Sequence, residues 1–542
     1  MSSFCGKRGD SATCHCGFCR LPLLAILKPS PQTQPLISHG GRHRDFEASM
    51  ASSIPIPHFT NHESLPPMEQ SFSSFIHSFP QYLETEQADR IREGEYSHLS
   101  VSDHACLDYV GHGLFSHRQQ QIQSPDAAAA STSSSAAVHY PIENPFFEIS
   151  HKSVSLNFEV KHGSGCPESE LESRIGKRIM QFMNISDEEY GVVFTANEPS
   201  AFKLVADCYP FATNRNLLTV YDHENDAVET MTKAAMKRGA RVSSAEFSWP
   251  ELRIETDKLQ REVVGKKKRK KKINELQNRG LFVFPAKSRV TGASYSYLWM
   301  NLAQENGWHV LLDASALAPK EMETLGFSLF RPDLLICPFY KVFGENPSGF
   351  GCLIVRKSIA ASILEDSDKA ASIVRLNAPA ASSLEFRGLD HADELGLIAI
   401  NARARLLVNW LVNSLLRLRH PSSGGVGVQL VRIYGPGVEF DRGTAVGFNV
   451  FDWRGERVDP AMVQKLAGRK GISLGCGSLR NLGSPGKRDG GGIAVVTAAI
   501  GMVTNFADVH RVWGLVSRFL DADFVEKERW RYTVLNQNTV EV

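Results

Sequence analysis

The sequence places Lys341 after the apolar run Leu334–Cys337, and a glycine-rich turn separates it from a second apolar run, Cys352–Val355. Short continuous runs of this kind are typical of sheet strands that are covered on both faces, so we expect this lysine near a core. A lysine beside a desolvated pocket has a lowered pKa and can form a Schiff base with a carbonyl compound. A lysine at a strand end can equally extend its ammonium group into water, and one residue does not decide between these interpretations.

Two further strand ends carry groups that could act together with this lysine. Asp313 follows the apolar run 309–312, and the segment 195–200 joins a strand end to a helix start, where free backbone N–H groups favour a phosphate. Pyridoxal phosphate needs a helix terminus for its phosphate, a lysine for its aldehyde and an acid for its ring nitrogen. The three strand ends together therefore indicate a pyridoxal phosphate site, whereas Asp313 alone could equally be a strand-end cap.

The elements that must position these groups begin at about residue 150, where the apolar spacing starts to alternate between helical and strand-like patterns. Helical spacing covers 168–183 and 226–239, and strand-like runs include 192–194, 216–222, 240–247, 279–285 and 308–313. This alternation predicts βαβ units, an α/β fold and a mostly parallel sheet. In such a sheet ligands bind outside the carboxyl ends of the strands, where the candidate residues lie.

Composition limits the class of protein and its compartment. Among 542 residues, Lys and Arg number 60 and Asp and Glu 59, so no global charge favours a nucleic-acid partner. The longest early apolar run, Leu21–Leu27, is too short to cross a membrane. Ten cysteines without a regular framework favour a reducing compartment, and we expect a cytoplasmic protein. The excess of basic residues in 1–44 is compatible with a plastid transit peptide and equally with a disordered leader.

Changes in composition also predict the domain boundaries. We expect a disordered leader over 1–100, and a docking segment with a low-complexity linker over 101–148. A large domain over 149–395 follows, and a linking helix with a small C-terminal α+β domain occupies 396–542. The lysine-rich stretch 266–272 predicts either a solvated insertion loop or a polyanion-binding run. Four residues near the amino terminus have metal-ligand side chains but no second ligand pair, so we expect no metal site. They are Cys14, His15, Cys16 and Cys19.

Six stretches resemble, in order, the aminotransferase-like domain of molybdenum cofactor sulfurases. This domain belongs to the class V, fold-type I pyridoxal phosphate enzymes, together with cysteine desulfurases. The stretches are 106–115, 190–206, 281–300, 308–317, 333–358 and 388–397. The resemblance implies that Lys341 binds the cofactor aldehyde and that Asp313 holds its ring nitrogen. It also implies a homodimer, and a plant-type stand-alone domain that ends at Val542 without a molybdenum cofactor-binding domain.

The sequence departs from this family at the expected phosphate loop. Where the family has Thr-Ser-Gly-Ala-Thr, this chain has Thr195, Ala196, Asn197, Glu198 and Pro199. A carboxylate therefore stands where a phosphate dianion is expected, and we expect phosphate affinity to be weakened. Thr195 and Asn197 remain the candidate phosphate ligands.

Four other positions differ from the family pattern. Pro338 replaces a serine before the lysine, and Lys287 stands where the family has a glutamine beside the cofactor. Asn225 has the spacing of the ring-stacking histidine, while His223 lies two positions early. Thr497 takes the place of an arginine that holds the substrate carboxylate, so an amino-acid substrate would lose a bidentate partner.

Cys476 has the placement of the family's sulfur-carrying cysteine, on a glycine-rich stretch after a strand. A desulfurase needs an accessible thiolate to take sulfur from cysteine as a persulfide. An inert cysteine in the small domain is the alternative interpretation. Two functional hypotheses follow: a pyridoxal phosphate-dependent desulfurase that passes sulfur to an acceptor, and a catalytically impaired fold-type I scaffold or binding protein.

Overall fold

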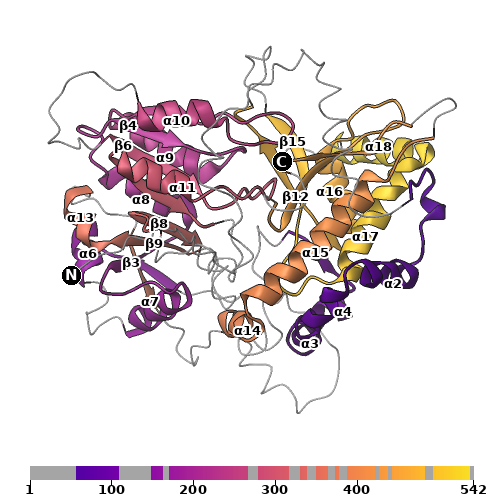
Figure 1. Ribbon diagram of the computed structural model, residues 1–542, viewed down its shortest axis with the longest axis horizontal. Coiled ribbons are helices and arrows are strands. Elements are labelled where there is room, and N and C mark those ends of the chain that lie inside the picture. The colour runs from indigo at the N-terminus through magenta and orange to yellow at the C-terminus, as the bar shows by residue number, and fades with distance from the viewer. Residues whose placement is uncertain are drawn as a thin grey trace, which may run out of the picture. The chain divides into compact units, whose positions relative to one another are not determined.

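The structure is a computed structural model (Figure 1). It describes residues 57–108, 148–162, 170–265, 279–315, 330–338, 350–363, 373–377, 387–421, 427–436, 442–482 and 492–537. Lys341, the lysine-rich stretch 266–272, the cysteines near the amino terminus and most of the expected linker lie outside the described residues.

Seven strands form the sheet of the large domain, in the order β3-β9-β8-β7-β6-β4-β5. β9 runs antiparallel to both of its neighbours, and the other pairings are parallel. The strands are β3 (Tyr190–Thr195), β4 (Asn216–Thr219), β5 (Arg241–Ser244), β6 (Gly280–Pro285), β7 (Trp308–Asp313), β8 (Leu334–Pro338) and β9 (Gly351–Arg356). The predicted α/β fold with a mostly parallel sheet is confirmed.

Helices cover both faces of this sheet, so its inner strands are largely apolar rather than alternating, whereas the edge strand β5 is mostly exposed. Leu311 packs in one core with α8 and α9, whereas the next residue, Leu312, packs in the opposite core with α7, α10 and α11. The helices are α7 (Glu170–Phe182), α8 (Glu198–Cys208), α9 (Asp226–Lys237), α10 (Thr256–Val264) and α11 (Leu298–Glu305).

A smaller antiparallel sheet, β11-β12-β15-β14, forms the small domain with a third core. Its strands are β11 (Val431–Tyr434), β12 (Ala445–Val450), β14 (Gly475–Leu479) and β15 (Ile493–Ala499). Its helices are α15 (Leu397–Leu416), α16 (Pro460–Arg469), α17 (Phe506–Ser517) and α18 (Ala522–Gln537), and η7 (Arg518–Leu520) joins the last two. Figure 1 shows α15, the expected linking helix, beside α17.

Shorter elements complete the described chain. β2 (Glu148–His151) pairs antiparallel with β10 (Val374–Asn377), and β1 (Ala105–Cys106) pairs parallel with β13 (Ile472–Ser473). The short helices of the large domain are α6 (Leu156–His162), α13 (Lys357–Ile363) and α14 (Arg387–Leu395). None of the helices in the described part of the chain has the length and hydropathy that a membrane span requires.

Helices fill part of the segment for which composition predicts a disordered leader. They are η1 (His62–Ser64), α2 (Met68–Ser78), η2 (Pro80–Thr85), α3 (Glu86–Glu95) and α4 (Ser97–Val101). Phe75 of α2 is buried, with its ring centroid 4.7 Å from Phe506 of α17 and 6.5 Å from Trp410 of α15. The apolar partners of this segment come from the other end of the chain, so local composition carries no sign of them.

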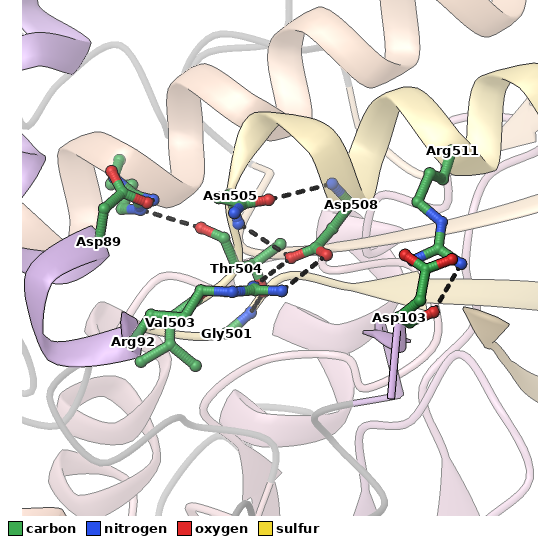
Figure 2. Close-up of polar contacts among 10 residues, drawn as sticks. Asp89, Arg92, Asp103, Gly501, Val503, Thr504, Asn505, Asp508 and Arg511 are labelled. Carbon is green, nitrogen blue, oxygen red and sulfur yellow. Dashed lines mark hydrogen bonds and ion pairs between the residues drawn. The ribbon is translucent and has the colours of Figure 1, made fainter. Parts of the chain in front are cut away.

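A buried ion pair joins this N-terminal segment to the small domain (Figure 2). Arg92 of α3 donates to the Val503 carbonyl at 2.8 Å and to both carboxylate oxygens of Asp508 at 2.5 and 3.1 Å. Asp508 also accepts from the Asn505 backbone N–H, which closes the capping box at the start of α17. The Arg92 and Asp508 side chains are only 8% and 4% exposed, so removing either leaves the other charge buried and unpaired.

We predict that Arg92→Met destabilises the protein by about 3–5 kcal/mol, because the Asp508 carboxylate then lies buried without a counter-ion. Urea unfolding followed by circular dichroism measures the change. The matched control is Arg90→Met, since the Arg90–Glu86 pair on the same helix is 72% and 66% exposed and should contribute less than about 1 kcal/mol. Equal unfolding midpoints for the two variants would contradict the prediction.

Candidate functional site

The carboxyl ends of the parallel strands bring several predicted site residues to one edge of the large sheet. Thr195 ends β3 and Asp313 ends β7, while Lys287 follows β6 within two residues. Asp313 pairs with Pro285 of β6 on one side and Ile336 of β8 on the other, which aligns these three strand ends. The edge matches the place where a ligand is expected in a sheet of this type.

Asp313 is the central carboxylate of this edge and is only 2% exposed. Its Oδ2 accepts a hydrogen bond of 2.8 Å from the Tyr221 hydroxyl, and its Oδ1 accepts one of 2.8 Å from the Ser315 backbone N–H. Burial, together with the Asp313 charge, raises the pKa of Tyr221 well above its usual value. The phenol therefore stays protonated and donates to the carboxylate across the ordinary pH range.

An arginine and a glutamate continue this set of contacts. One Nη of Arg289 donates to the Ser315 hydroxyl at 3.2 Å and to Oε2 of Glu198 at 3.3 Å. Glu198 is the first residue of α8, so its carboxylate also lies at the positive end of the helix dipole. The contacts run without a break from Tyr221 through Asp313, Ser315 and Arg289 to Glu198.

The first turn of α8 uses its own side chains as acceptors. Asn197 is the N-cap, and its Oδ1 accepts a hydrogen bond of 2.9 Å from the Ser200 N–H. Thr195 is fully buried, and its hydroxyl donates to the Asn197 carbonyl at 3.0 Å. A phosphate needs unoccupied N–H donors and positive charge, whereas this turn holds a capping amide and a carboxylate. Thr195, Asn197 and Glu198 therefore do not fit a phosphate group.

The residues expected beside the cofactor ring have other partners. The Asn225 side chain caps α9 by accepting from the N–H groups of Ala227 and Val228 at 2.9 and 3.2 Å. Lys287 is half-buried, and a β-bridge joins its backbone to Ser294. Lys341, the expected covalent link to the cofactor, lies outside the described residues.

A buried aspartate and histidine follow β4. Nδ1 of His223 lies 2.7 Å from Oδ1 of Asp222, and this oxygen also accepts from the Ser288 hydroxyl at 2.7 Å. Oδ2 of Asp222 accepts from the Thr291 hydroxyl at 2.7 Å. Nε2 of His223 is buried and has no hydrogen-bond partner. Burial alone would raise the pKa of Asp222, but the hydrogen bonds from His223, Thr291 and Ser288 lower it below its usual value.

Sequence reasoning missed Tyr221, Asp222 and Arg289 as members of the site. Tyr221 and Asp222 follow the end of β4 within three residues, and Arg289 follows β6 within four. Their positions just after parallel strands were the available signal, because that edge gathers polar side chains. The contacts among these side chains depend on their length and direction across three neighbouring strands. The spacing of residues along the sequence does not determine these contacts.

Cys476 lies within strand β14 rather than on a loop after a strand. It is exposed, and its Sγ lies 3.7 Å from the Pro460 carbonyl. Partial burial of the thiol, together with the carboxylates of Asp459 and Asp108, raises the pKa of Cys476 to about 11. The thiolate that a sulfur carrier needs is therefore scarce near neutral pH.

Thr497, at the expected arginine position, lies in β15 and is 8% exposed. Its backbone pairs with Gly447 of β12 and Gly475 of β14, so the residue sits inside the small sheet. A threonine hydroxyl offers one donor and no positive charge, and it does not supply the bidentate carboxylate contact of an arginine.

Comparison with solved structures defines the class of fold. The apo cysteine desulfurase from Thermococcus onnurineus NA1 is 16% identical with a TM-score of 0.53, covering 80% of this chain and 98% of that chain. The cysteine desulfurase CsdA from Escherichia coli is 15% identical with a TM-score of 0.50 and the same coverage. No protein-family model matches the chain. The chain has the fold-type I architecture of class V aminotransferases and cysteine desulfurases.

Comparison with curated proteins identifies its distant relatives. The molybdenum cofactor sulfurase of Oryza sativa subsp. japonica is 24% identical over 471 residues, which cover 78% of this chain and 53% of that protein. The sulfurase of Solanum lycopersicum is 22% identical over 468 residues, with the same coverage. The chain is a distant homologue of molybdenum cofactor sulfurases, as its sequence motifs predict. It spans about half the length of the curated relatives it matches.

We predict that iodoacetamide alkylates Cys476 slowly at neutral pH, and that its rate rises about tenfold per pH unit between pH 8 and pH 10. The reason is that only the thiolate reacts, and the pKa of this thiol is about 11. Peptide mass spectrometry of timed reactions measures the rate at this residue, with free glutathione as the reference thiol. A rate that levels off below pH 9 would refute the expected burial effect.

Proposed function

We propose that this chain is a non-catalytic protein with the desulfurase fold, in which side chains of the protein itself fill the edge that would receive a cofactor. We infer that it acts as a binding or scaffold protein. The ion pair between Glu198 and Arg289 is the observation that carries this proposal. It places a carboxylate at the helix end where a cofactor phosphate would have to lie, and it pairs that carboxylate with the Arg289 guanidinium.

The size of the electrostatic effect supports this interpretation. Two like unit charges about 4 Å apart near a protein surface repel by about 4 kcal/mol, which corresponds to roughly a thousandfold loss of affinity. A phosphate dianion beside Glu198 would meet at least this penalty. The Arg289 guanidinium does not offset it freely, since one of its Nη atoms already donates to both Glu198 and Ser315.

A second candidate function is a pyridoxal phosphate-dependent desulfurase that takes sulfur from cysteine through a persulfide and passes it to an acceptor. The buried Asp313 carboxylate at the end of β7 favours it, as does the distant relation to molybdenum cofactor sulfurases. In this candidate Lys341 binds the cofactor and Cys476 carries the sulfur. The raised pKa of the Cys476 thiol argues against that second role.

We predict that the purified chain retains no pyridoxal phosphate after incubation and dialysis, and that it releases no sulfide from cysteine. Visible absorption, together with borohydride reduction and mass spectrometry of the peptide that contains Lys341, detects any bound cofactor. About one cofactor per chain, with sulfide release, would overturn the proposal in favour of the desulfurase. In that case Lys341→Ala should abolish the absorption, and Cys476→Ser should abolish the persulfide.

A pair of variants separates the effect of the ion pair from other causes of weak binding. Glu198→Ser removes the carboxylate from the strand-end edge and keeps the Arg289 guanidinium, so we expect this variant to gain pyridoxal phosphate affinity by tenfold or more. The control is Glu246→Ser, which breaks a comparable ion pair on the surface, where Glu246 and Lys258 are 49% and 46% exposed. Equal affinity in wild type and in both variants would refute the role assigned to Glu198.

A further inference from the structure

Two cysteines face each other across adjacent strands of the large sheet. Cys337 of β8 and Cys352 of β9 are direct partners in the antiparallel register, and both side chains are fully buried. Their Sγ atoms lie 3.0 Å apart. The neighbouring residue Ile336 pairs with Asp313, so the cysteine pair lies beside the carboxylate at the centre of the candidate site.

The backbone already has the separation that a covalent bond between these residues needs. Directly opposed residues in an antiparallel pair have Cα atoms about 4.5–5.5 Å apart. A disulfide spans Cα separations of about 4.4–6.8 Å. The register of Cys337 and Cys352 therefore suits a cross-strand disulfide.

We propose that Cys337 and Cys352 form a redox pair, which a peroxide converts into a cross-strand disulfide. The proposal is independent of the function proposed above. In the first step one thiolate attacks a peroxide oxygen, the O–O bond breaks, and a sulfenic acid and water form. In the second step the other sulfur attacks the sulfenic sulfur, an S–S bond forms and a second water leaves. The two sulfurs lose two electrons in total, hydrogen peroxide gains them, and the two thiol protons end in the water molecules.

The surroundings of the pair favour a slow and selective reaction. Both thiols are enclosed by the apolar core that α7, α10 and α11 share with the sheet. The contact with Cys352 and burial, together with the charge of Asp313, raise the pKa of Cys337 well above its usual value. Few thiolates are therefore present, and a small oxidant such as hydrogen peroxide reaches them more readily than a disulfide reagent. Once a sulfenic acid forms, its partner is already in contact and can close the bond before a second oxidation.

Oxidation at this position would act directly on the candidate site. The disulfide would fix β8 to β9 one residue from Ile336, which is the sheet partner of Asp313. It would also replace two thiols by a group that has no proton to donate. The carboxyl edge of the sheet would then have two forms that differ only in the oxidation state of these two sulfurs.

The test uses the full-length chain, reduced with dithiothreitol, desalted and exposed to graded hydrogen peroxide without denaturant. The protein is then unfolded, alkylated with iodoacetamide and digested. We expect the two alkylations at Cys337 and Cys352 to disappear together, with a linked pair of peptides that dithiothreitol separates. We also expect the oxidised protein to have a higher thermal midpoint than the reduced protein, because the bond constrains the unfolded chain.

Two variants keep the result specific. Cys208→Ser changes another buried cysteine of the large domain and should form the linked peptides as wild type does. Cys352→Ser should form none, and if it folds less well, the wild-type peptide map alone still decides the question. Full alkylation of both cysteines even after prolonged exposure to peroxide far above the concentration that oxidises free glutathione would overturn the proposal. So would a cross-link that forms only in urea, or one that joins either residue to a different cysteine.

Discussion

A buried carboxylate must find hydrogen-bond donors, and at the carboxyl edge of the large sheet this requirement governs the neighbouring side chains. Asp313 takes one donor from Tyr221 and one from the backbone of Ser315. The Ser315 hydroxyl in turn accepts from Arg289, and Arg289 pairs with the Glu198 carboxylate. Each group in this series makes a hydrogen bond or an ion pair with the group before it. The central acid of this desulfurase-type fold thus has a protein donor on each of its two oxygens.

The fold could be predicted from the sequence further than the site could. Apolar runs such as 308–313 predict strands without knowledge of the strands that pair with them. The glycines and helical repeats between these runs predict the order of strands and helices in the βαβ units. Asp313 was found because it follows such a run. The helix start expected in 195–200 and the helix expected over 226–239 are present, but the side chains of Asn197 and Asn225 each cap their own helix. Spacing cannot tell whether a polar residue at a helix start faces a ligand or the backbone.

The N-terminal segment shows where composition misleads. Its abundance of Ser, Pro and His is typical of disorder, since such a chain cannot bury enough apolar surface by itself. Here the missing surface is supplied by α15 and α17, and the rings of Phe75 and Phe506 lie 4.7 Å apart. The buried charge of Arg92 is neutralised by Asp508 of the same helix α17. The order of this segment is thus a property of the assembled small domain rather than of the segment.

That dependence has a consequence for synthesis. Arg92 and the carbonyl that it binds are 411 positions apart in the chain. A ribosome adds about 5–20 residues per second, so the first partner waits roughly 20–80 seconds for the second. During this interval the aromatic face of α2 is exposed on a nascent chain that cannot yet bury it. Transiently exposed apolar surface of this kind favours aggregation, and the small domain is completed only when the last tenth of the protein emerges.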